Sequence, residues 1–159
     1  MKIKSIHAFR VDVTPKTQTE PRVPQLPGDH GFVHPMHRYP EFSRAQLAPG
    51  RGNWSRLACV VTAEDGTWGF GQALFSGPVM ALINDHLAPM LEGQQVMAIE
   101  KIWDIMQRST SAFGTAGLVS YAISAVDNAL WDLKGKVLGR PVYELLGGPQ
   151  KEKIFCYAS

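Results

Sequence analysis

The sequence has little of what would place a protein at once among secreted, membrane or nucleic-acid-binding classes. Its 159 residues include only two cysteines and carry a formal net charge of +2. This small charge gives no basis for binding nucleic acid. The first four residues lack the apolar core of a signal peptide, and no apolar run approaches the ~20 residues that span a bilayer. We therefore expect a soluble, cytoplasmic protein that binds neither nucleic acid nor membranes.

Several catalytic signatures are also missing from the sequence. It contains no Gly-x-Ser-x-Gly, Walker A or His-Glu-x-x-His pattern. The glycines of Gly69-Phe70-Gly71 and Gly147-Gly148 lack the strand-turn-helix context of a dinucleotide-binding loop. Cys59 and Cys156 lie in apolar, strand-like runs, so we expect buried free thiols and neither a disulfide nor a metal site.

The sequence does contain a clear alternation of strand and helix patterns. Hydrophobic residues make up 45% of the chain and charged residues 19%, which is typical of a globular domain with a core. The first strand is predicted from alternation at Ile3, His7, Phe9, Val11 and Val13, which we expect to face inward. Two further strands, residues 56–63 and 67–74, are predicted to form a hairpin through Asp65-Gly66.

Three helices are predicted after these strands. Apolar residues recur at helical spacing behind Pro78, over residues 78–91, and Pro89 is expected to end or kink this helix. The second helix is predicted to begin near Ile99 and to end near Ser109-Thr110, and the third covers residues 118–138. Strands followed by helices indicate an α+β domain in which a three-stranded antiparallel sheet carries helices on one face.

The residues from Gly139 onward are predicted to lead into a second domain. Gly139 is predicted to end the third helix, Pro141 to open a one-turn helix, and Gly147-Gly148 to end it. Residues 153–158 then read as an apolar strand. We expect residues 1–140 to form one domain, and residues 141–159 to be a linker helix and the first strand of a second domain.

Residues 14–54 interrupt this order, because they are rich in proline and glycine and show no convincing periodicity. A connection of this length is typical of a functional lid or of a disordered segment. It also concentrates most of the histidine in the chain and much of the arginine: His30, His34, His37, Arg38, Arg44 and Arg51. Such side chains can bind a carboxylate or hydroxyls, or they can simply be solvated. A zinc site is disfavoured, because these histidines lie among proline and glycine residues and lack the rigid support that such a site needs.

Residues 122–148, which read AISAVDNALWDLKGKVLGRPVYELLGG, together with Ile154-Phe155-Cys156-Tyr157-Ala158, carry a resemblance to a known family. They resemble the enolase superfamily, in its mandelate racemase-like branch, at the point where the N-terminal capping domain passes into the first strand of a (β/α)-barrel. The resemblance implies an enolase-like N-terminal capping domain, followed by a barrel that this chain does not contain.

A second, shorter resemblance lies within residues 14–54. Pro35-Met36, Tyr39 and Ser43-Arg44 are similar to the capping loop of rhamnonate dehydratases and related acid-sugar dehydratases, with one residue fewer between the tyrosine and the arginine. In those enzymes a histidine and an arginine of this loop contact the bound acid sugar. The resemblance places Arg44 at the arginine. It places the histidine at His30, with His34 as the second choice.

The resemblance also implies a reaction. The intact protein would be a homo-oligomeric, Mg²⁺-dependent acid-sugar dehydratase, in which a base and metal ligands of the barrel remove an α-proton before water leaves. This chain would then supply substrate contacts but no catalytic or metal-binding residue. Asp127 and Asp132 do not change this expectation, because they lie about 140° apart around a helix and do not converge on one ligand. A racemase or cycloisomerase of the same superfamily, or a non-catalytic binding module, remains the alternative.

Overall fold

A computed structural model describes residues 1–11, 38 and 55–156 of the chain, and all structural statements refer to these residues. Strands β1 (Ile3–Arg10), β2 (Leu57–Ala63) and β3 (Trp68–Ala73) form one antiparallel sheet in the order β1-β2-β3. The β2–β3 hairpin turns at Gly66, which has a φ of 88°. Asp65 supports this turn by accepting a hydrogen bond from the Thr67 N–H at 2.9 Å. The predicted sheet and hairpin are confirmed.

Ile3 is buried as predicted, but from Ile6 to Phe9 the side chains of β1 face the opposite way from our prediction. Ile6 and Ala8 are buried, whereas His7 is exposed and 41% of Phe9 is accessible to solvent. The pairing of β1 with β2 shifts register between Ile3 and Ser5. This irregularity changes the parity of the strand, so that Ile3 and Ile6 can both face the helices. A strict count of alternate residues could not reveal it.

The first helical run is continuous through Pro89. It consists of α1 (Ser76–Ala81), the π-helical η4 (Leu82–Leu87) and α2 (Ala88–Leu91). Pro89 has no N–H to donate. The π-helical turn before it has a wider hydrogen-bond spacing, so the regular i to i−4 hydrogen bonds of an α-helix are interrupted where that donor would be needed. Of the two effects expected of Pro89, an end of the helix is wrong, because the run continues to Leu91; the winding instead changes from π-helical to α-helical at Ala88, one residue before the proline.

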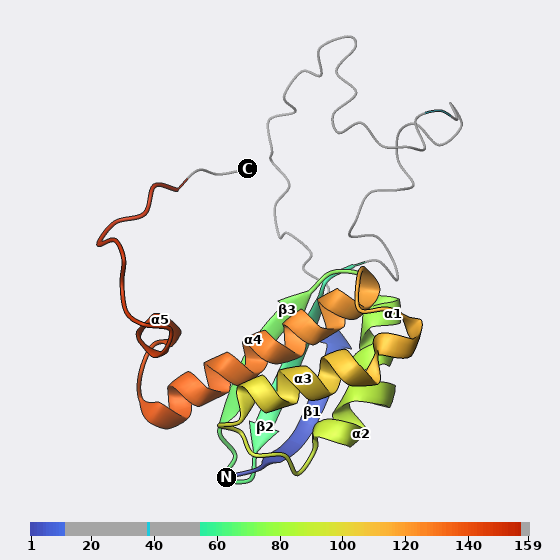
Figure 1. Ribbon diagram of the computed structural model, residues 1–159, viewed down its shortest axis with the longest axis horizontal. Coiled ribbons are helices and arrows are strands. Elements are labelled where there is room, and N and C mark those ends of the chain that lie inside the picture. Colours follow the sequence, from blue (N-terminus) through green and yellow to red (C-terminus); the bar gives the residue numbers. More distant parts are fainter. Residues whose placement is uncertain (12–37, 39–54, 157–159) are drawn as a thin grey trace.

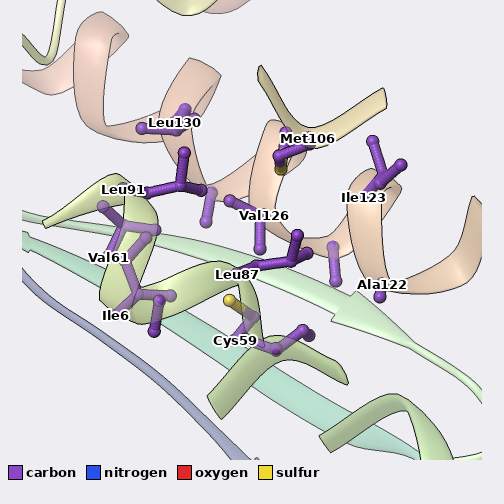
Figure 2. Packing of buried hydrophobic residues seen from close by; sticks show 14 of the residues in the cluster. Ile6, Cys59, Val61, Leu87, Leu91, Met106, Ala122, Ile123, Val126 and Leu130 are labelled. Atoms are coloured by element: carbon purple, nitrogen blue, oxygen red, sulfur yellow. The ribbon is translucent and has the colours of Figure 1, made fainter. Parts of the chain in front are cut away.

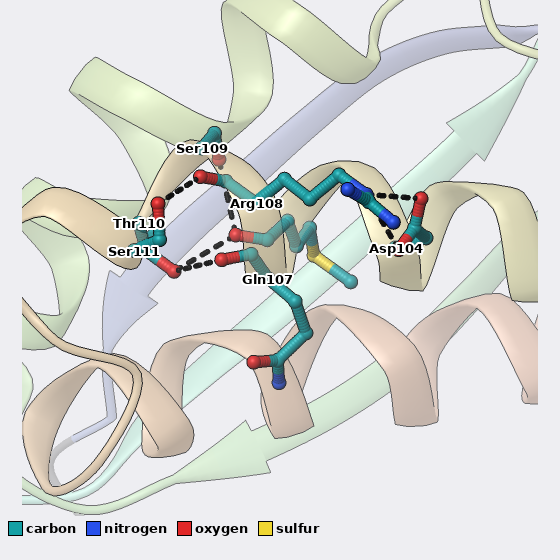
Figure 3. A network of polar contacts seen from close by, with 7 residues as sticks. Asp104, Gln107, Arg108, Ser109, Thr110 and Ser111 are labelled. Atoms are coloured by element: carbon teal, nitrogen blue, oxygen red, sulfur yellow. Dashed lines mark hydrogen bonds and ion pairs between the residues drawn. The ribbon is translucent and has the colours of Figure 1, made fainter.

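Helix α3 (Ile99–Ser109) ends where the sequence predicted, and its end is held by hydroxyl groups. The Thr110 hydroxyl donates to the Met106 carbonyl at 2.9 Å, and the Ser111 hydroxyl donates to the Arg108 carbonyl at 2.8 Å (Figure 3). The Met106 carbonyl also accepts the Thr110 N–H at 3.3 Å, so the hydroxyl groups add to the backbone bonds that cap the last turn. A short 3₁₀ turn, η5 (Ser111–Phe113), then leads toward α4.

Helix α4 (Leu118–Leu138) is the longest element and packs most extensively against β3. It ends at Gly139, which has the left-handed φ of 62° that the sequence predicted for a helix stop. The helices cover one face of the sheet (Figure 1). Buried side chains from the strands and helices meet between these two layers, among them Ile6, Val61, Leu87, Met106 and Val126 (Figure 2). This arrangement confirms the predicted α+β class.

The chain leaves this domain through α5 (Val142–Leu145), the one-turn helix that was predicted behind Pro141. Residues 153–156 adopt no strand and residues 157–159 lie outside the described part, so the strand expected over residues 153–158, as part of a second domain's sheet, stays a prediction. A strand needs a neighbour to accept and donate its backbone hydrogen bonds, and the three-stranded sheet offers none here. Cys156 is consequently exposed and is not the buried thiol that we expected, whereas Cys59 is buried as predicted.

Candidate functional site

The residues predicted to contact substrate are not placed by the structure. His30 and Arg44, and the alternative His34, all lie outside the described residues. Of the histidines and arginines in residues 14–54, only Arg38 is described, and it is exposed. The described residues that are nearest to this segment along the chain are those at the two points where it joins the sheet.

Both ends of the segment are attached at one end of the sheet. Arg10 pairs with Leu57, and Leu57 pairs with Ala73, so the last residues of β1 and β3 lie beside the first residue of β2. The Val11 N–H donates to the Arg56 carbonyl at 3.0 Å, which extends this pairing beyond the strands. Antiparallel order thus brings the two ends of the segment together, next to the connection from β3 to α1 (Figure 1).

Four residues at this end of the sheet form what we call the sheet-end cluster: Ser55, Phe75, Ser76 and Tyr121. The hydroxyl oxygens of Ser55 and Ser76 lie 3.0 Å apart, and the Ser76 N–H donates to the Ser55 carbonyl, also at 3.0 Å. Both serines are buried, at 8% and 1% exposure. One hydroxyl donates to the other, and this bond together with the backbone bond fixes the residue before β2 to the start of α1.

Phe75 gives this cluster an unusual backbone. It precedes α1 with φ 62° and ψ 53°, and among the described residues it is the only one other than glycine with a positive φ. This conformation costs a bulky residue roughly 1 kcal/mol or more, and such strain concentrates at functional sites. The Phe75 ring packs edge-on against the ring of Tyr121, with centroids 4.9 Å apart. Tyr121 lies in the first turn of α4, so the contact joins α4 to the cluster.

The sequence analysis missed the sheet-end cluster. Pro78 marks the start of α1 correctly, but no residue around Phe75 signals a left-handed conformation, for which glycine or asparagine is the usual choice. The pairing of Ser55 with Ser76 depends on the strand register, which brings together residues that are 21 positions apart. Only the folded arrangement shows that these groups meet.

The carboxylates considered in the sequence do not combine into a site. Asp132 accepts a hydrogen bond from the Phe70 N–H at 2.8 Å and pairs with Lys136 at 2.7 Å. Asp127 lies elsewhere on α4, half-buried, and this burial raises the pKa of its carboxyl group. Within residues 1–11 and 55–156, no three histidine, cysteine, aspartate or glutamate side chains gather as a metal site would require. None of the helices described there is long and apolar enough to cross a bilayer.

Comparisons with known proteins agree with this architecture. Residues 40–147 match the family model described as the mandelate racemase/muconate lactonizing enzyme, N-terminal domain. The chain is 40% identical, over all of its 159 residues, to an L-rhamnonate dehydratase of Saccharopolyspora erythraea, and it spans 40% of the length of that relative.

Solved structures match the same fold. The rhamnonate dehydratase of Gibberella zeae, in complex with Mg, matches with a TM-score of 0.75 and 28% identity, over 95% of this chain and 38% of that one. The 3,6-anhydro-D-galactonate cycloisomerase of Zobellia galactanivorans matches with a TM-score of 0.58 and 36% identity, over 60% of this chain and 27% of that one. The matched fold and the family model confirm the superfamily that the sequence indicated: the chain belongs to the mandelate racemase/muconate lactonizing enzyme family of the enolase superfamily, and it forms the N-terminal domain.

Proposed function

We propose that this chain is the capping domain of an acid-sugar dehydratase that acts on rhamnonate or a closely similar aldonate. The observation that carries the proposal is the 40% identity to an L-rhamnonate dehydratase over the whole chain. The reaction removes the proton α to the substrate carboxylate and then expels the β-hydroxyl as water, which leaves a 2-keto-3-deoxy acid. The residues that would move these protons belong to a barrel domain outside this chain.

The contribution of this chain would be recognition of the acid sugar. Arg44 presents a guanidinium, whose fork of donors suits a carboxylate or neighbouring hydroxyl oxygens, and His30 supplies an imidazole that can bond to a hydroxyl. The sheet-end cluster supports this role, because it fixes the attachment of residues 12–54 at one end of the sheet through the buried Ser55–Ser76 pair. Fixed attachment points limit the positions that a loop between them can reach, which favours a defined placement of Arg44 and His30.

The chain would join the barrel through its last residues. We propose that residues 1–140 are the capping domain, and that residues 141–159 lead from it into the barrel. The exposure of Ile154 and Phe155, at 79% and 91%, supports this assignment, because large apolar side chains gain stability when another domain covers them.

Mg²⁺ is part of the proposed enzyme but has no ligands in the described part of this chain. When bound, Mg²⁺ would stabilise the negative charge that develops on the substrate carboxylate. It requires near-octahedral oxygen coordination, and residues 1–11 and 55–156 hold no cluster of acidic side chains that could provide it. We therefore assign the metal to the barrel and derive no step from this domain through it.

The alternative within the family is a cycloisomerase, and it rests on the 36% identity to the 3,6-anhydro-D-galactonate cycloisomerase. Incubation of the full-length protein and Mg²⁺ with rhamnonate, other six-carbon aldonates and 3,6-anhydro-galactonate tests both functions. We expect a 2-keto-3-deoxy acid from rhamnonate or another aldonate, detected by NMR. Conversion of the anhydro sugar alone would favour the cycloisomerase, and no reaction with any acid sugar would contradict the proposal.

A further inference from the structure

Gly135 lies inside α4, where a glycine needs a reason. Glycine is among the poorest helix formers and alanine is the best. Gly135 is buried, and it is not among the glycines with a positive φ, so it is not required for a turn. A β-carbon added there would lie 2.8 Å from the Arg140 carbonyl oxygen and 3.6 Å from a methyl group of Val142. The first distance is too short for an ordinary contact, so the glycine makes room for the chain that follows the helix.

Residues 139–142, which we call the exit turn, fold back against this point. The Arg140 N–H donates to the Gly135 carbonyl at 2.9 Å, and the Gly139 N–H donates to the Lys136 carbonyl at 3.2 Å. These are the two bonds of a Schellman motif. The Arg140–Glu144 ion pair, at 3.1 Å, joins the exit turn to α5 and not to α4. The exit turn is therefore held on α4 by backbone bonds and by the space at Gly135.

The exit turn lies at the end of α4 that is far from the sheet-end cluster. Because α4 has 21 residues, it is about 30 Å long. Tyr121 lies in its first turn, whereas α5 follows its last turn (Figure 1). A shift of about 0.5 Å over the last helical turn, which rises about 5 Å, corresponds to a tilt of about 6° and displaces the far end by about 3 Å. A small change at Gly135 is thus enlarged at the end of the sheet where residues 12–54 are attached.

We propose that Gly135 is a positioning residue, which sets the angle between the capping domain and the barrel by letting the exit turn lie directly on α4. The proposal rests on the proposed function, in which residues 141–159 lead into the barrel and the opposite end of the domain carries the segment that recognises the acid sugar. A side chain at Gly135 would rotate that end relative to the barrel. The catalytic groups of the barrel would stay intact, while contacts from the capping domain to the substrate would be lost.

Crystal structures and steady-state kinetics of the full-length protein test this role. Gly135→Ala introduces the β-carbon, and we expect it to change the angle between the two domains. It should raise KM for the best aldonate by roughly tenfold with kcat nearly unchanged, because binding is lost equally in the ground and transition states. A role in stability alone would lower the amount of active enzyme, and therefore kcat, without changing KM. Ser124→Ala, at an exposed position of the same helix, is the matched control and should keep the parent angle and KM.

A second variant separates the direction of the exit turn from the steric effect of the β-carbon. One glycine inserted between Gly139 and Arg140 leaves the side chains of α4 unchanged but alters the path of the chain, so we expect the same rise in KM. Circular dichroism melts establish which variants fold, and the insertion decides the question if Gly135→Ala does not. The parent angle or the parent KM in the folded variants would overturn the proposal. If the parent protein converts no acid sugar, the proposed function fails, and the domain angle alone then tests the role of Gly135.

Discussion

Two glycines of β3 allow the longest helix to lie directly on the sheet. A β-carbon added at Gly71 would collide with the Ala125 carbonyl oxygen of α4, and one added at Gly69 would collide with the Ala129 carbonyl oxygen. Both obstacles are backbone atoms, which cannot move aside as a side chain can. Neither glycine has a positive φ, so they are required for close approach and not for a turn.

Gly71→Ala should therefore destabilise the domain by about 1–3 kcal/mol, because the helix must shift away from the sheet. Gln72→Ala is the matched control, since Gln72 is exposed on the same strand, and it should change stability by no more than about 0.5 kcal/mol. The midpoint of urea unfolding measures both effects. Equal midpoints for Gly71→Ala and the parent chain would show that α4 does not contact β3 as closely as described.

The two cysteines should differ sharply in reactivity. Burial raises the pKa of the Cys59 thiol to about 12. At pH 8 this leaves Cys59 roughly a thousandfold less ionised than an ordinary exposed thiol, and the thiolate is the reactive form. We expect a thiol reagent to modify the exposed Cys156 rapidly and Cys59 only after denaturation. Rapid modification of Cys59 in the folded Cys156→Ser variant would contradict this burial.

The raised pKa of Cys59 should also lower the stability of the folded state as the pH rises above 9. The pKa of Cys59 is about 12 in the folded state, whereas an unfolded chain loses this proton near the ordinary thiol pKa of 9.0. Above pH 9 the unfolded state therefore binds fewer protons than the folded state, and its relative free energy falls as pH rises. Between pH 9 and 11, the parent chain should lose more stability than Cys59→Ala, as measured by urea unfolding. An identical loss in the two proteins would contradict the burial of this thiol.

At the scale of elements, side chains from the helices bond to backbone groups at both edges of the sheet, in the place of a further strand. Asn84 does so for β1, through two hydrogen bonds to the backbone of Ala8. Asn84→Ala would leave a partly buried donor and acceptor without these bonds, at an expected cost of about 1–3 kcal/mol. Asp85→Ala, at the exposed neighbouring position, is the control and should have little effect. Urea unfolding of the two variants makes the comparison, and equal stabilities would show that the edge of β1 does not depend on Asn84.

The sequence predicted the existence of the helices and strands more accurately than it predicted their orientation. Strong local signals, such as Asp65-Gly66, Pro78 and Gly139, located the hairpin, the first helix and the end of α4 correctly. The inward face of β1 was predicted wrongly, because a shift in pairing register has no local signal. The strand expected over residues 153–158 is not present at 153–156, because strand formation depends on partners that local sequence cannot supply. The sheet-end cluster could not be predicted for the same reason.

At the scale of the whole molecule, we propose that recognition and catalysis lie in different domains. The chain spans 40% of the length of its dehydratase relative, and its described residues include no cluster of metal ligands. We expect the 159-residue chain by itself to show no micromolar Mg²⁺ site in calorimetry and no dehydration of acid sugars. A tight Mg²⁺ site on this chain would contradict the assignment of the metal to the barrel.

The proposed contribution of residues 14–54 to recognition rests on Arg44. Arg44→Ala would remove a charge-assisted contact worth about 1.5–3 kcal/mol, which corresponds to a loss of roughly 10- to 150-fold in kcat/KM. Arg44→Lys keeps the charge but loses the planar fork, so it should also be impaired if the contact is bidentate. Arg108→Ala is the control, because Arg108 is exposed on α3 and pairs only with Asp104 among the contacts described for its side chain.

The most direct test of the central claim, that this chain recognises the acid sugar for a dehydratase, is kcat/KM for dehydration by the full-length enzyme. It should be measured with the best aldonate substrate for the parent, Arg44→Ala, Arg44→Lys and Arg108→Ala. We predict a clear loss in both Arg44 variants and the parent value in Arg108→Ala. Parent values in both Arg44 variants would contradict the claim and would leave residues 14–54 as a connection without a role in recognition.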